Sequence, residues 1–324
     1  RGVGNNGLDL EDASNVVVNE SVILDTGSAG IYTQAGGDIV IESNVIRRTT
    51  GVGIRVFQSF ANNNITYIRD NVITDTSSTA INSVRASITV NNTIRRSGRH
   101  GIYVQDSDAR LLDNRIVDST ESGIRFNNPG LASNPTNVSI ENTTIKSSGR
   151  NGIRAIDSVV GVNDTTIRGS DKRTLKFSRD STVRTRDLDI GPSSAANTTL
   201  DLEALDVSLT NETAPPADPG SEANISRFVN ATNESSAASS YLNVTFEYTN
   251  GDVSGVDEST LSVWKNNGTW TELGAGPATD PAQNRIQFNV TNFGSVFAPL
   301  AGDDTGPLFT DPLTDSFSAP PTNT

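Results

Sequence analysis

Few side chains in this protein have a type and spacing that could support catalysis. Cysteine is absent, which excludes disulfides and thiolate metal ligands. His100 is the single histidine, and because the sequence offers no evident partner for it, we interpret it as a turn residue at the start of a strand. Asp106 and Asp108 are close in sequence, but acid–base chemistry on sugars needs two carboxylates that face one cleft. We therefore predict no catalytic residue, no metal site and no cofactor.

Five other residues have the chemistry of a sugar-binding surface. Each directly follows a Gly-Ile pair: Tyr32, Arg55, Tyr103, Arg125 and Arg154. Tyrosine offers a flat face to a sugar ring, and arginine binds carboxylate or sulfate through two parallel hydrogen bonds. Equivalent positions hold Asp9, Asn82 and Lys176. We predict one outward row that contacts acidic glycans, and the alternative is an ordinary solvated row of polar side chains.

The elements that would position this row belong to an internal repeat. An asparagine precedes a Gly-Ile or Ala-Ile pair by nine residues in four units, which contain Asn44, Asn71, Asn92 and Asn114. Ser21 takes the asparagine position one unit earlier, while Asn142 and Asn163 continue the series with steps one and two residues longer. Short apolar strands at a period of about 20 to 30 residues, without helical periodicity, are typical of a β-solenoid.

Each unit contains three short apolar strands, which predicts three parallel sheets around one narrow core. Alternate side chains of the first strand point inward, so one continuous inward column should contain Ile54, Ile81, Ile102, Ile124 and Ile153. The asparagines should stack at one corner, where their amides bond to the copies above and below and tolerate left-handed backbone angles. A row of alternating charge should favour correct register, and it consists of Arg48, Asp75, Arg96 and Asp118.

Two units are longer than the others, and both carry their extra residues after the first strand, at 57–63 and 127–136. These segments should project from the same side of the solenoid. One-sided insertions in repeat proteins often mark a binding face, and neutral drift in a surface loop is the alternative.

The units Gly101-Ile102-Tyr103-Val104 and Gly123-Ile124-Arg125-Phe126, each with Asn-x-Ile or a variant after it, resemble right-handed parallel β-helix repeats of the pectate-lyase-like superfamily. The resemblance covers about residues 5 to 200 and implies about eight coils. That superfamily contains lyases, hydrolases, epimerases and non-catalytic adhesion proteins, and its polysaccharide cleft lies along the first sheet. Its lyases commonly use Arg or Lys as base with bound calcium. Acidic calcium ligands are missing beside Arg125 and Arg154, where the neighbours are Phe126, Asn127, Ala155 and Ile156.

Charge is distributed unevenly along the chain, whose net charge is −13. Residues 1–202 are neutral overall, whereas residues 203–324 hold 16 acidic side chains against only Arg227, Lys265 and Arg285. Arginine outnumbers lysine by 21 to 4, and aspartate outnumbers glutamate by 26 to 12. This composition resembles that of secreted proteins from salt-loving archaea, where molar salt shortens the Debye length to about 3 Å. We expect no nucleic-acid partner, and no apolar run reaches the length of about 18 residues that a transmembrane segment needs.

The sequence also carries signals of an exterior location. It opens on Arg1-Gly2-Val3-Gly4 without a methionine or a signal sequence, so we interpret it as a mature or excised piece of a longer precursor. Fourteen Asn-x-Ser/Thr sites indicate an N-glycosylated protein, although several flank predicted strands. They are Asn19, Asn64, Asn91, Asn137, Asn142, Asn163, Asn197, Asn211, Asn224, Asn230, Asn233, Asn243, Asn267 and Asn289.

The repeat ends near Leu202, and a second pattern follows. We predict a linker at 203–222, a small acidic β-sandwich at 223–302 and a disordered spacer at 303–324. Alternating segments at 242–248, 261–264, 269–273 and 286–290, separated by Asn250-Gly251 and Asn266-Asn267-Gly268, indicate antiparallel hairpins. The run Val256-Asp257-Glu258-Ser259, with Trp264 and Trp270 after it, resembles the small β domains that precede cell-surface anchors of haloarchaeal exported proteins.

We therefore expect an all-β protein, with a right-handed three-sheet parallel β-helix at 1–202 and a small antiparallel β-sandwich after it. Its expected role is structural or adhesive, outside the cell or at its surface, with an acidic polysaccharide or surface glycan as partner. One alternative is a polysaccharide lyase or epimerase that uses the outward face of the first sheet. Another is a subunit of a surface filament that self-associates through solenoid ends or sheet edges, because open ends expose unpaired strands.

Overall fold

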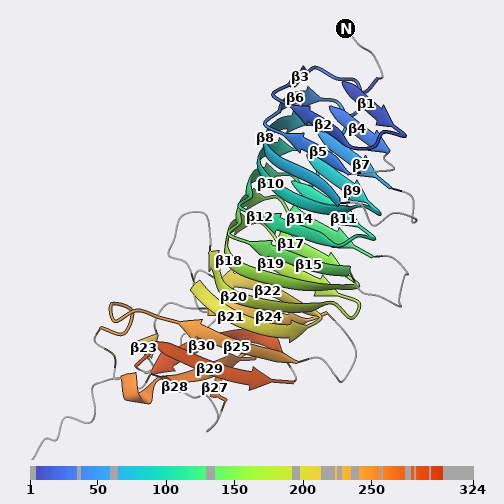
Figure 1. Ribbon diagram of the computed structural model, residues 1–324. Coiled ribbons are helices and arrows are strands. Elements are labelled where there is room, and N and C mark those ends of the chain that lie inside the picture. Colours follow the sequence, from blue (N-terminus) through green and yellow to red (C-terminus); the bar gives the residue numbers. More distant parts are fainter. Residues whose placement is uncertain are drawn as a thin grey trace, which may run out of the picture.

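A computed structural model describes residues 5–34, 38–58, 65–128, 136–191, 198–212, 223–224, 228–234, 241–254, 256, 258–273, 279–280, 282–291 and 293–301. Apart from one 3-10 turn, η1 (Glu258–Thr260), all elements among these residues are strands. No helix in the described part of the chain has the length and apolar character needed to span a bilayer. The strands stack as successive coils into an elongated solenoid, with the C-terminal strands at one end (Figure 1).

The first sheet receives one parallel strand from each of eight successive coils. Its parallel strands are β1 (Leu8–Glu11), β4 (Ile31–Gln34), β7 (Ile54–Phe57), β9 (Ile81–Val84), β11 (Ile102–Gln105), β14 (Ser122–Asn127), β17 (Asn151–Ile156) and β19 (Arg173–Ser178). The predicted number of coils is confirmed by this order.

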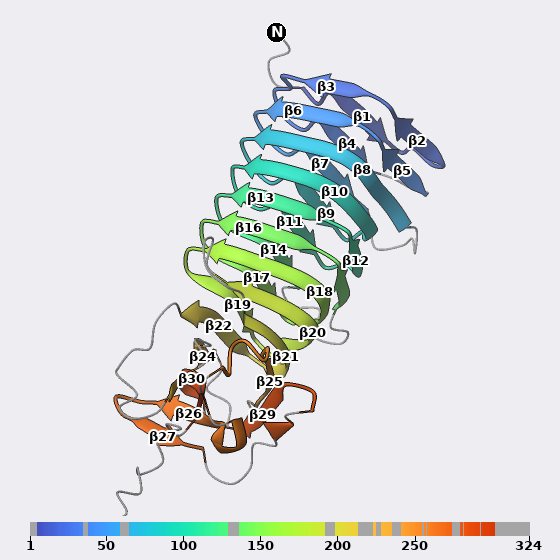
Figure 2. The ribbon, with the colours of Figure 1, turned by 90° about the vertical axis from the view of Figure 1, so that its left-hand side faces the viewer.

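The second and third sheets meet at the asparagine corner. Second-sheet strands are β2 (Val16–Asn19), β5 (Ile39–Glu42), β8 (Ile65–Thr76), β10 (Ser87–Ser97), β12 (Ala109–Leu112), β15 (Thr136–Glu141), β18 (Ser158–Ser170) and β20 (Thr182–Gly191). The third sheet contains β3 (Val22–Leu24), β6 (Val45–Thr49), β13 (Arg115–Ser119) and β16 (Thr144–Ser148), together with the second halves of β8, β10, β18 and β20, which continue around the corner within one strand. Figure 2 shows these third-sheet strands one below another.

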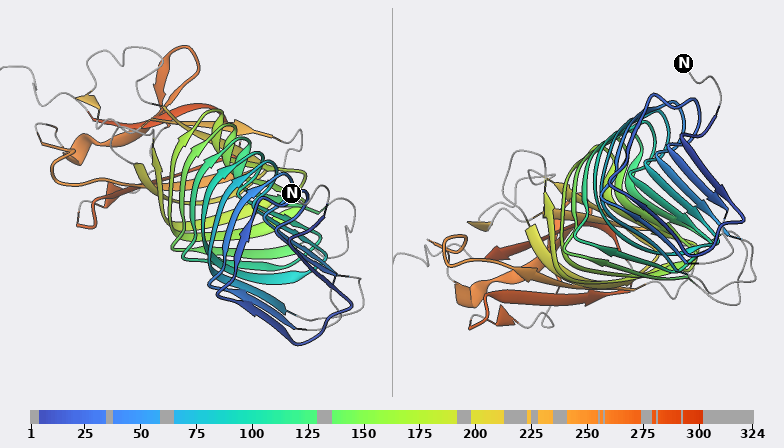
Figure 3. Two further views of the ribbon diagram at one scale, coloured as in Figure 1. Left: turned by 90° about the horizontal axis from the view of Figure 1, so that it is seen from above. Right: turned by 45° about the horizontal axis from the view of Figure 1, so that its top comes forward.

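The core is a set of parallel isoleucine columns. Ile54, Ile81, Ile102, Ile124 and Ile153 are direct neighbours in register and are fully buried, which confirms the predicted inward column. The coils surround a common interior when viewed from above (Figure 3). Burial of an isoleucine side chain contributes about 1.5 to 3 kcal/mol, so repetition of such columns stabilises every coil against its neighbours.

The glycine of each Gly-Ile pair is required by close packing at the corner between the third and first sheets. A Cβ atom built on Gly101 would lie 2.5 Å from Cγ2 of Ile116 and 2.6 Å from the carbonyl oxygen of Gly123. Gly53 and Gly152 show equivalent approaches to Ile73 and Ile167. The repeat therefore places glycine where two coils approach too closely for a side chain.

The asparagines form the predicted ladder at the corner of the second and third sheets. Nδ2 of Asn44 donates to Oδ1 of Asn71 at 3.0 Å, and Nδ2 of Asn71 donates to Oδ1 of Asn92 at 2.9 Å. Each amide also caps backbone groups, as where Nδ2 of Asn71 donates to the carbonyl of Ile41 at 2.8 Å. Buried polar groups need such partners, so the ladder fixes how the coils stack.

Two expectations about this ladder were wrong. Asn142 and Asn163 do not continue it: the register places Thr143 and Thr165 over Asn114, and both threonines are buried, while Asn142 is exposed. The extra residues in these two coils shift the asparagines out of the corner. The left-handed backbone also falls on the residue before the ladder position, with φ of 56° at both Ser43 and Asp70, and not on the asparagines themselves.

The row of alternating charge is present, and two of its members, Arg96 and Asp75, form an ion pair, while Arg48 pairs with Asp25 one coil earlier. Nε of Arg48 contacts Asp25 at 2.6 Å, and Nε of Arg96 contacts Asp75 at 2.5 Å, each pair linking successive coils. These residues have positive φ, between 53° and 58°. Such exposed pairs are weak individually but oppose slippage of one coil against the next.

The C-terminal strands continue the solenoid's own sheets, now in antiparallel order. The first sheet continues from β19 through β22 (Val207–Glu212), β24 (Phe228–Asn233), β30 (Gly294–Ala301), β26 (Ser262–Asn266) and β27 (Trp270–Glu272), with β23 (Ala223–Asn224) beside β30. The second continues from β20 through β21 (Thr198–Leu205), β25 (Leu242–Glu247), β29 (Arg285–Val290) and β28 (Thr279–Asp280). The two extensions face each other, and one hydrophobic core runs from Val18 to Ala301.

Antiparallel pairing after the repeat is thus confirmed, but the strands of the predicted sandwich share one hydrophobic core with the β-helix. Phe246 and Phe288 stack within the second sheet, and Phe288 stacks at 5.1 Å on Phe297 of the first. Residues 203–205 and 207–212, predicted as part of a linker, lie in β21 and β22. The Asn266-Asn267-Gly268 turn forms the expected hairpin, whereas the strands on either side of Asn250-Gly251 lie in different sheets. The predicted tail at 303–324 lies outside the described residues.

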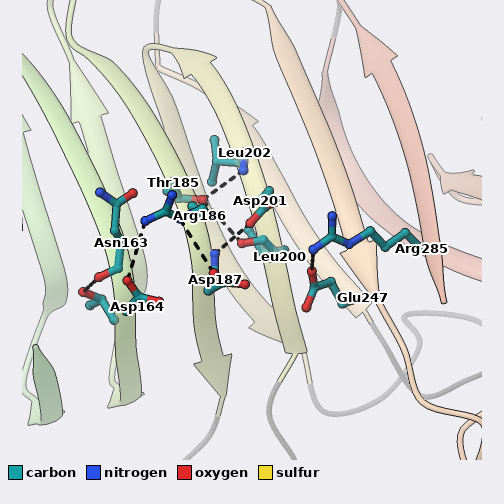
Figure 4. A network of polar contacts seen from close by, with 11 residues as sticks. Asn163, Asp164, Thr185, Arg186, Asp187, Leu200, Asp201, Leu202, Glu247 and Arg285 are labelled. Carbon is teal, nitrogen blue, oxygen red and sulfur yellow. Dashed lines mark hydrogen bonds and ion pairs between the residues drawn. The ribbon is translucent and has the colours of Figure 1, made fainter. Parts of the chain in front are cut away.

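A bulge marks the change from parallel to antiparallel pairing (Figure 4). Between Arg184 and Leu188 strand β20 contains one residue more than its partner β21. Thr185 Oγ1 accepts from the Leu202 amide at 2.9 Å, and Oδ1 of Asp201 accepts from the Asp187 amide at 2.7 Å. These side chains satisfy backbone groups that the interrupted ladder leaves unpaired.

The two long coils differ from the others at a single corner. Gln58 follows β7 and Asn128 follows β14, at equivalent positions, and both side chains are buried. Most of the predicted insertions, residues 59–64 and 129–135, lies outside the described residues. Their flanking strands place both between the first and second sheets.

Candidate functional site

The predicted outward row exists on the first sheet. Strand register makes each member the direct neighbour of the next, in the order Asp9, Tyr32, Arg55, Asn82, Tyr103, Arg125, Arg154 and Lys176. Arg55 is exposed, and the four residues from Tyr103 to Lys176 are half-buried. All five residues predicted to contact a glycan are therefore in one row, and ligand binding by them stays a prediction.

Each tyrosine of the row is held in place by its neighbours. The guanidinium carbon of Arg55 lies 5.8 Å from the centroid of the Tyr32 ring. The Tyr32 hydroxyl donates to Oε1 of Gln34 at 2.9 Å. Tyr103 repeats this arrangement, with Arg125 over its ring at 5.4 Å and its hydroxyl 3.0 Å from Gln105. Each ring thus has a cation against one face, a contact worth about 0.5 to 2 kcal/mol.

The first tyrosine also borders a hollow in the surface. Tyr32 and Arg55 line an open depression of about 360 Å³. Its other lining residues are Asn6, Glu11, Ser28, Ala29, Gly51, Val52 and Ser78. Hydrogen-bond donors, acceptors and one aromatic ring therefore line this open space.

His100 lies at the centre of the row but under its surface. Its side chain is in contact with Glu121, whose Oε2 is 3.4 Å from Nε2, and Nδ1 accepts from the Ser122 amide at 3.4 Å. The residue is 3 % exposed, and burial, with the charge of Arg125, lowers the pKa of His100 to about 4. Since Nδ1 accepts from the backbone, the neutral ring carries its proton on Nε2.

No partner for His100 is evident in the sequence, but Glu121 and Arg125 lie beside it in the structure. Glu121 and Arg125 belong to the next coil, and Nη1 of Arg125 lies 3.4 Å from the imidazole. The distance in sequence, about one coil length, was the signal that could have identified this cluster. Asp106 and Asp108 are not part of it: Asp106 accepts from Gln105, and Asp108 accepts from the amide of Asn137 at 2.9 Å.

Arg125 and Arg154 are adjacent cations of the row. They are Cα partners in neighbouring strands, and neither forms an ion pair within the described ranges. Burial lowers the pKa of Arg154, and the charges of Arg125 and Arg150 lower it further. Like charges this close repel each other, so a bound anion would stabilise the site.

The C-terminal end of the row meets an acid from the antiparallel strands. Nζ of Lys176 lies 2.8 Å from Oε2 of Glu234, and Nε of Arg173 lies 3.6 Å from Oε1. Glu234 also accepts from the hydroxyl of Ser208. Among the described residues, no group of three or more His, Cys, Asp or Glu side chains could hold a metal ion.

The described N-glycosylation candidates are mostly accessible. Asn19, Asn137, Asn142, Asn267 and Asn289 are exposed, and the half-exposed ones are Asn91, Asn163, Asn230, Asn233 and Asn243. Asn211 lies in β22 and Asn224 in β23, while Asn64 and Asn197 lie outside the described residues.

The fold and its repeat agree with one known family. The model of the right handed beta helix region matches residues 2–90 and 80–187, and the chain belongs to this family. No curated protein matches the sequence.

Similar solved structures include two tailspike proteins. The Dettilon tailspike protein (gp208) is 10% identical, over 91% of this chain and 87% of that chain, with a TM-score of 0.33. The Siphovirus 9NA tailspike receptor binding domain is 11% identical, over 88% of this chain and 68% of that chain, with a TM-score of 0.30. At these TM-scores neither similarity carries an argument about function.

Proposed function

We propose that this β-helix is an extracellular, cell-surface adhesive protein that binds acidic glycans along the outer face of its first sheet. The observation that carries this proposal is the pair Arg125 and Arg154, two half-buried cations in adjacent strands without an acidic partner in the described part of the chain. Carboxylate or sulfate groups on successive sugars are the ligands that match two arginines at this spacing. Tyr103 beside them supplies a ring for stacking.

Binding is favoured over catalysis by the burial of the imidazole. His100 is 3 % exposed and neutral above about pH 4, so it can position Arg125 but has little direct access to a ligand. The proton of the Tyr103 hydroxyl is also engaged, because this hydroxyl donates to Gln105. A polysaccharide lyase or epimerase is the second candidate, favoured by the meeting of His100, Tyr103 and Arg125 in one cluster.

The positions of the glycosylation candidates support a binding role for this face. None of the eight parallel strands of the first sheet contains an Asn-x-Ser/Thr asparagine. Within the described parallel coils such asparagines lie in second-sheet strands or directly after one: Asn19, Asn91, Asn137, Asn142 and Asn163. Glycans there would project from the second sheet and leave the row uncovered.

A surface location in a salt-loving archaeon is part of the proposal, and composition supports it. The net negative charge is concentrated after residue 202, where basic residues are scarce, and arginine and aspartate outnumber lysine and glutamate. At molar salt, long-range attraction is screened and only contacts at short range hold a ligand. A row that combines tyrosine stacking with direct arginine hydrogen bonds suits that condition.

The test is binding of polygalacturonate to the whole chain by titration calorimetry in molar NaCl, with fully methyl-esterified pectin as the uncharged match. We expect binding of the charged polymer alone. Equal binding of both polymers, or of neither, would contradict the proposal. Release of unsaturated products, followed by ultraviolet absorbance, would instead support the lyase.

A further inference from the structure

The cationic row ends at a residue from the antiparallel strands. We propose that Glu234 is a built-in anion that occupies the ligand position at Lys176 and so limits the glycan-binding row to the coils before it. This inference rests on the proposed function, because it concerns the extent of the same row.

The geometry places the Glu234 carboxylate against the last two cations of this face. Oε2 lies 2.8 Å from Nζ of Lys176, Oε1 lies 3.6 Å from Nε of Arg173, and the Ser208 hydroxyl donates to the same carboxylate. The backbone of Glu234 is fixed as well, because its amide donates to the carbonyl of Asp206 at 2.7 Å. The carboxylate is therefore held in one place by both its side chain and its backbone.

Register explains why this acid meets the row. Lys176 is the Cα partner of Ser208 in β22, and Ser208 is the partner of Thr232 in β24. The next position in register with the row therefore holds a buried serine and not a cation where the antiparallel strands begin. Glu234 directly follows β24 and lies near this boundary.

The contacts of Glu234 are those expected of a bound ligand carboxylate. Its side chain is 15% exposed and that of Lys176 is 22% exposed, so the pair is largely withdrawn from solvent. Burial acts to raise the pKa of Glu234, but hydrogen bonds from Lys176 and Ser208 and the charges of Lys176 and Arg173 outweigh it and lower the pKa. Glu234 is therefore ionised at neutral pH, and its charge neutralises a cation that otherwise resembles Arg125 and Arg154.

A polyanion on the row consequently finds open cations at Arg125 and Arg154 and an occupied one at Lys176. Extending the ligand toward β19 would add no new ion pair and would bring its charge near Glu234. Affinity should then stop rising with ligand length once Arg154 is covered.

The test uses oligogalacturonates of increasing length, titrated in molar NaCl against the whole chain. Glu234→Gln keeps the size of the side chain and removes its charge, so the longer oligomers should bind about three- to tenfold more tightly while the shortest binding oligomer is unaffected. Glu203→Gln is the matched control, because Glu203 pairs with Arg184 on the second sheet. It should leave every affinity unchanged.

The double variant Lys176→Gln/Glu234→Gln should return to wild-type affinity at every length, since the released cation is then missing. Melting temperatures identify any variant that fails to fold. If Glu234→Gln does not fold, Lys176→Gln replaces it and should bind as the wild type does; a loss like that of Arg154→Ala would overturn the inference.

The outcomes separate the two proposals. Identical binding by wild type and Glu234→Gln at all lengths would overturn the role of Glu234 and leave the proposed function in place. Binding by Glu234→Gln alone would overturn both, because the wild-type row would then be closed at every length and Glu234 would block the whole row and not its last position only. Binding by neither protein would overturn both.

Discussion

Arg125 lies over the ring of Tyr103, its guanidinium carbon 5.4 Å from the ring centroid, although the two residues come from successive coils. The arginine is placed by coil stacking and also lies 3.4 Å from the buried His100. The centre of the row is thus a preorganised cation whose neighbours are fixed. Because the Arg125 side chain is already ordered, ligand binding costs the protein little side-chain entropy, and this favours affinity.

Replacing both residues tests the row. Tyr103→Ala/Arg125→Ala should weaken polygalacturonate binding in molar salt by about 1 to 3 kcal/mol, because stacking and a charge-assisted hydrogen bond are lost together. Titration calorimetry measures the change. Arg110→Ala, an exposed arginine on the second sheet, is the control and should bind normally. Unchanged binding by the double variant would reduce the row to ordinary polar surface.

Asn71 should be more important for stability than any asparagine outside the ladder. Asn71→Ala removes the acceptor for the amide and backbone N–H of Asn44 and the donor to the carbonyl of Ile41, all buried. We expect a loss of at least about 3 kcal/mol in the free energy of unfolding, measured in urea. Asn137→Ala, at an exposed position of strand β15 with ordinary backbone angles, should cost less than about 0.5 kcal/mol. Similar losses for both would show that the ladder does not stabilise the coils.

Gly101 tests the close packing at the corner. In Gly101→Ala the new methyl group would lie 2.5 Å from Ile116 and 2.6 Å from the Gly123 carbonyl, so coils must shift, at a cost of about 1 to 3 kcal/mol. Gly294→Ala is the control, since nothing lies within 4 Å of its new methyl group. The natural Ala80 shows that one coil accommodates this group. A neutral effect at Gly101 would extend that tolerance to the whole column and contradict the packing argument.

His100 should make stability depend on pH. Its pKa in the folded protein, about 4, is below the ordinary value of 6.5, so the unfolded chain binds the proton more readily. Stability should therefore fall as the pH falls from about 6.5 to 4, by on the order of 3 kcal/mol from this residue. Urea unfolding of wild type and His100→Gln across that range isolates the contribution as the difference between the two curves. Parallel curves would mean that His100 keeps an ordinary pKa.

The sequence was sufficient for the parallel coils because a repeat specifies the same contact many times. The column from Ile54 to Ile153 and the row from Asp9 to Lys176 follow from one spacing, and the strand register agrees with both. The spacing was less informative where the coils lengthen. Thr143 replaces the expected Asn142 in the ladder, because one extra residue moves the asparagine past the corner.

Contacts between coils at other positions could not be predicted from one unit. Glu121 lies beside His100 because the chain between them forms one full coil. Neither residue repeats in the other coils. Likewise Glu234 reaches Lys176 across 58 residues, through strands that reverse direction after β20. Such pairs depend on the path of the whole chain, which local patterns do not contain.

The antiparallel strands at the end of the stack have a consequence for how this molecule can change in size. Because β22 and β21 cover the last parallel strands β19 and β20, the final coil is already closed whatever the number of coils before it. A duplicated or deleted internal unit would therefore alter neither terminus, and would lengthen or shorten the rod by about 4.8 Å. The distance between the first coil and the C-terminal strands can therefore change in fixed steps of one coil, while both ends of the rod keep the same structure.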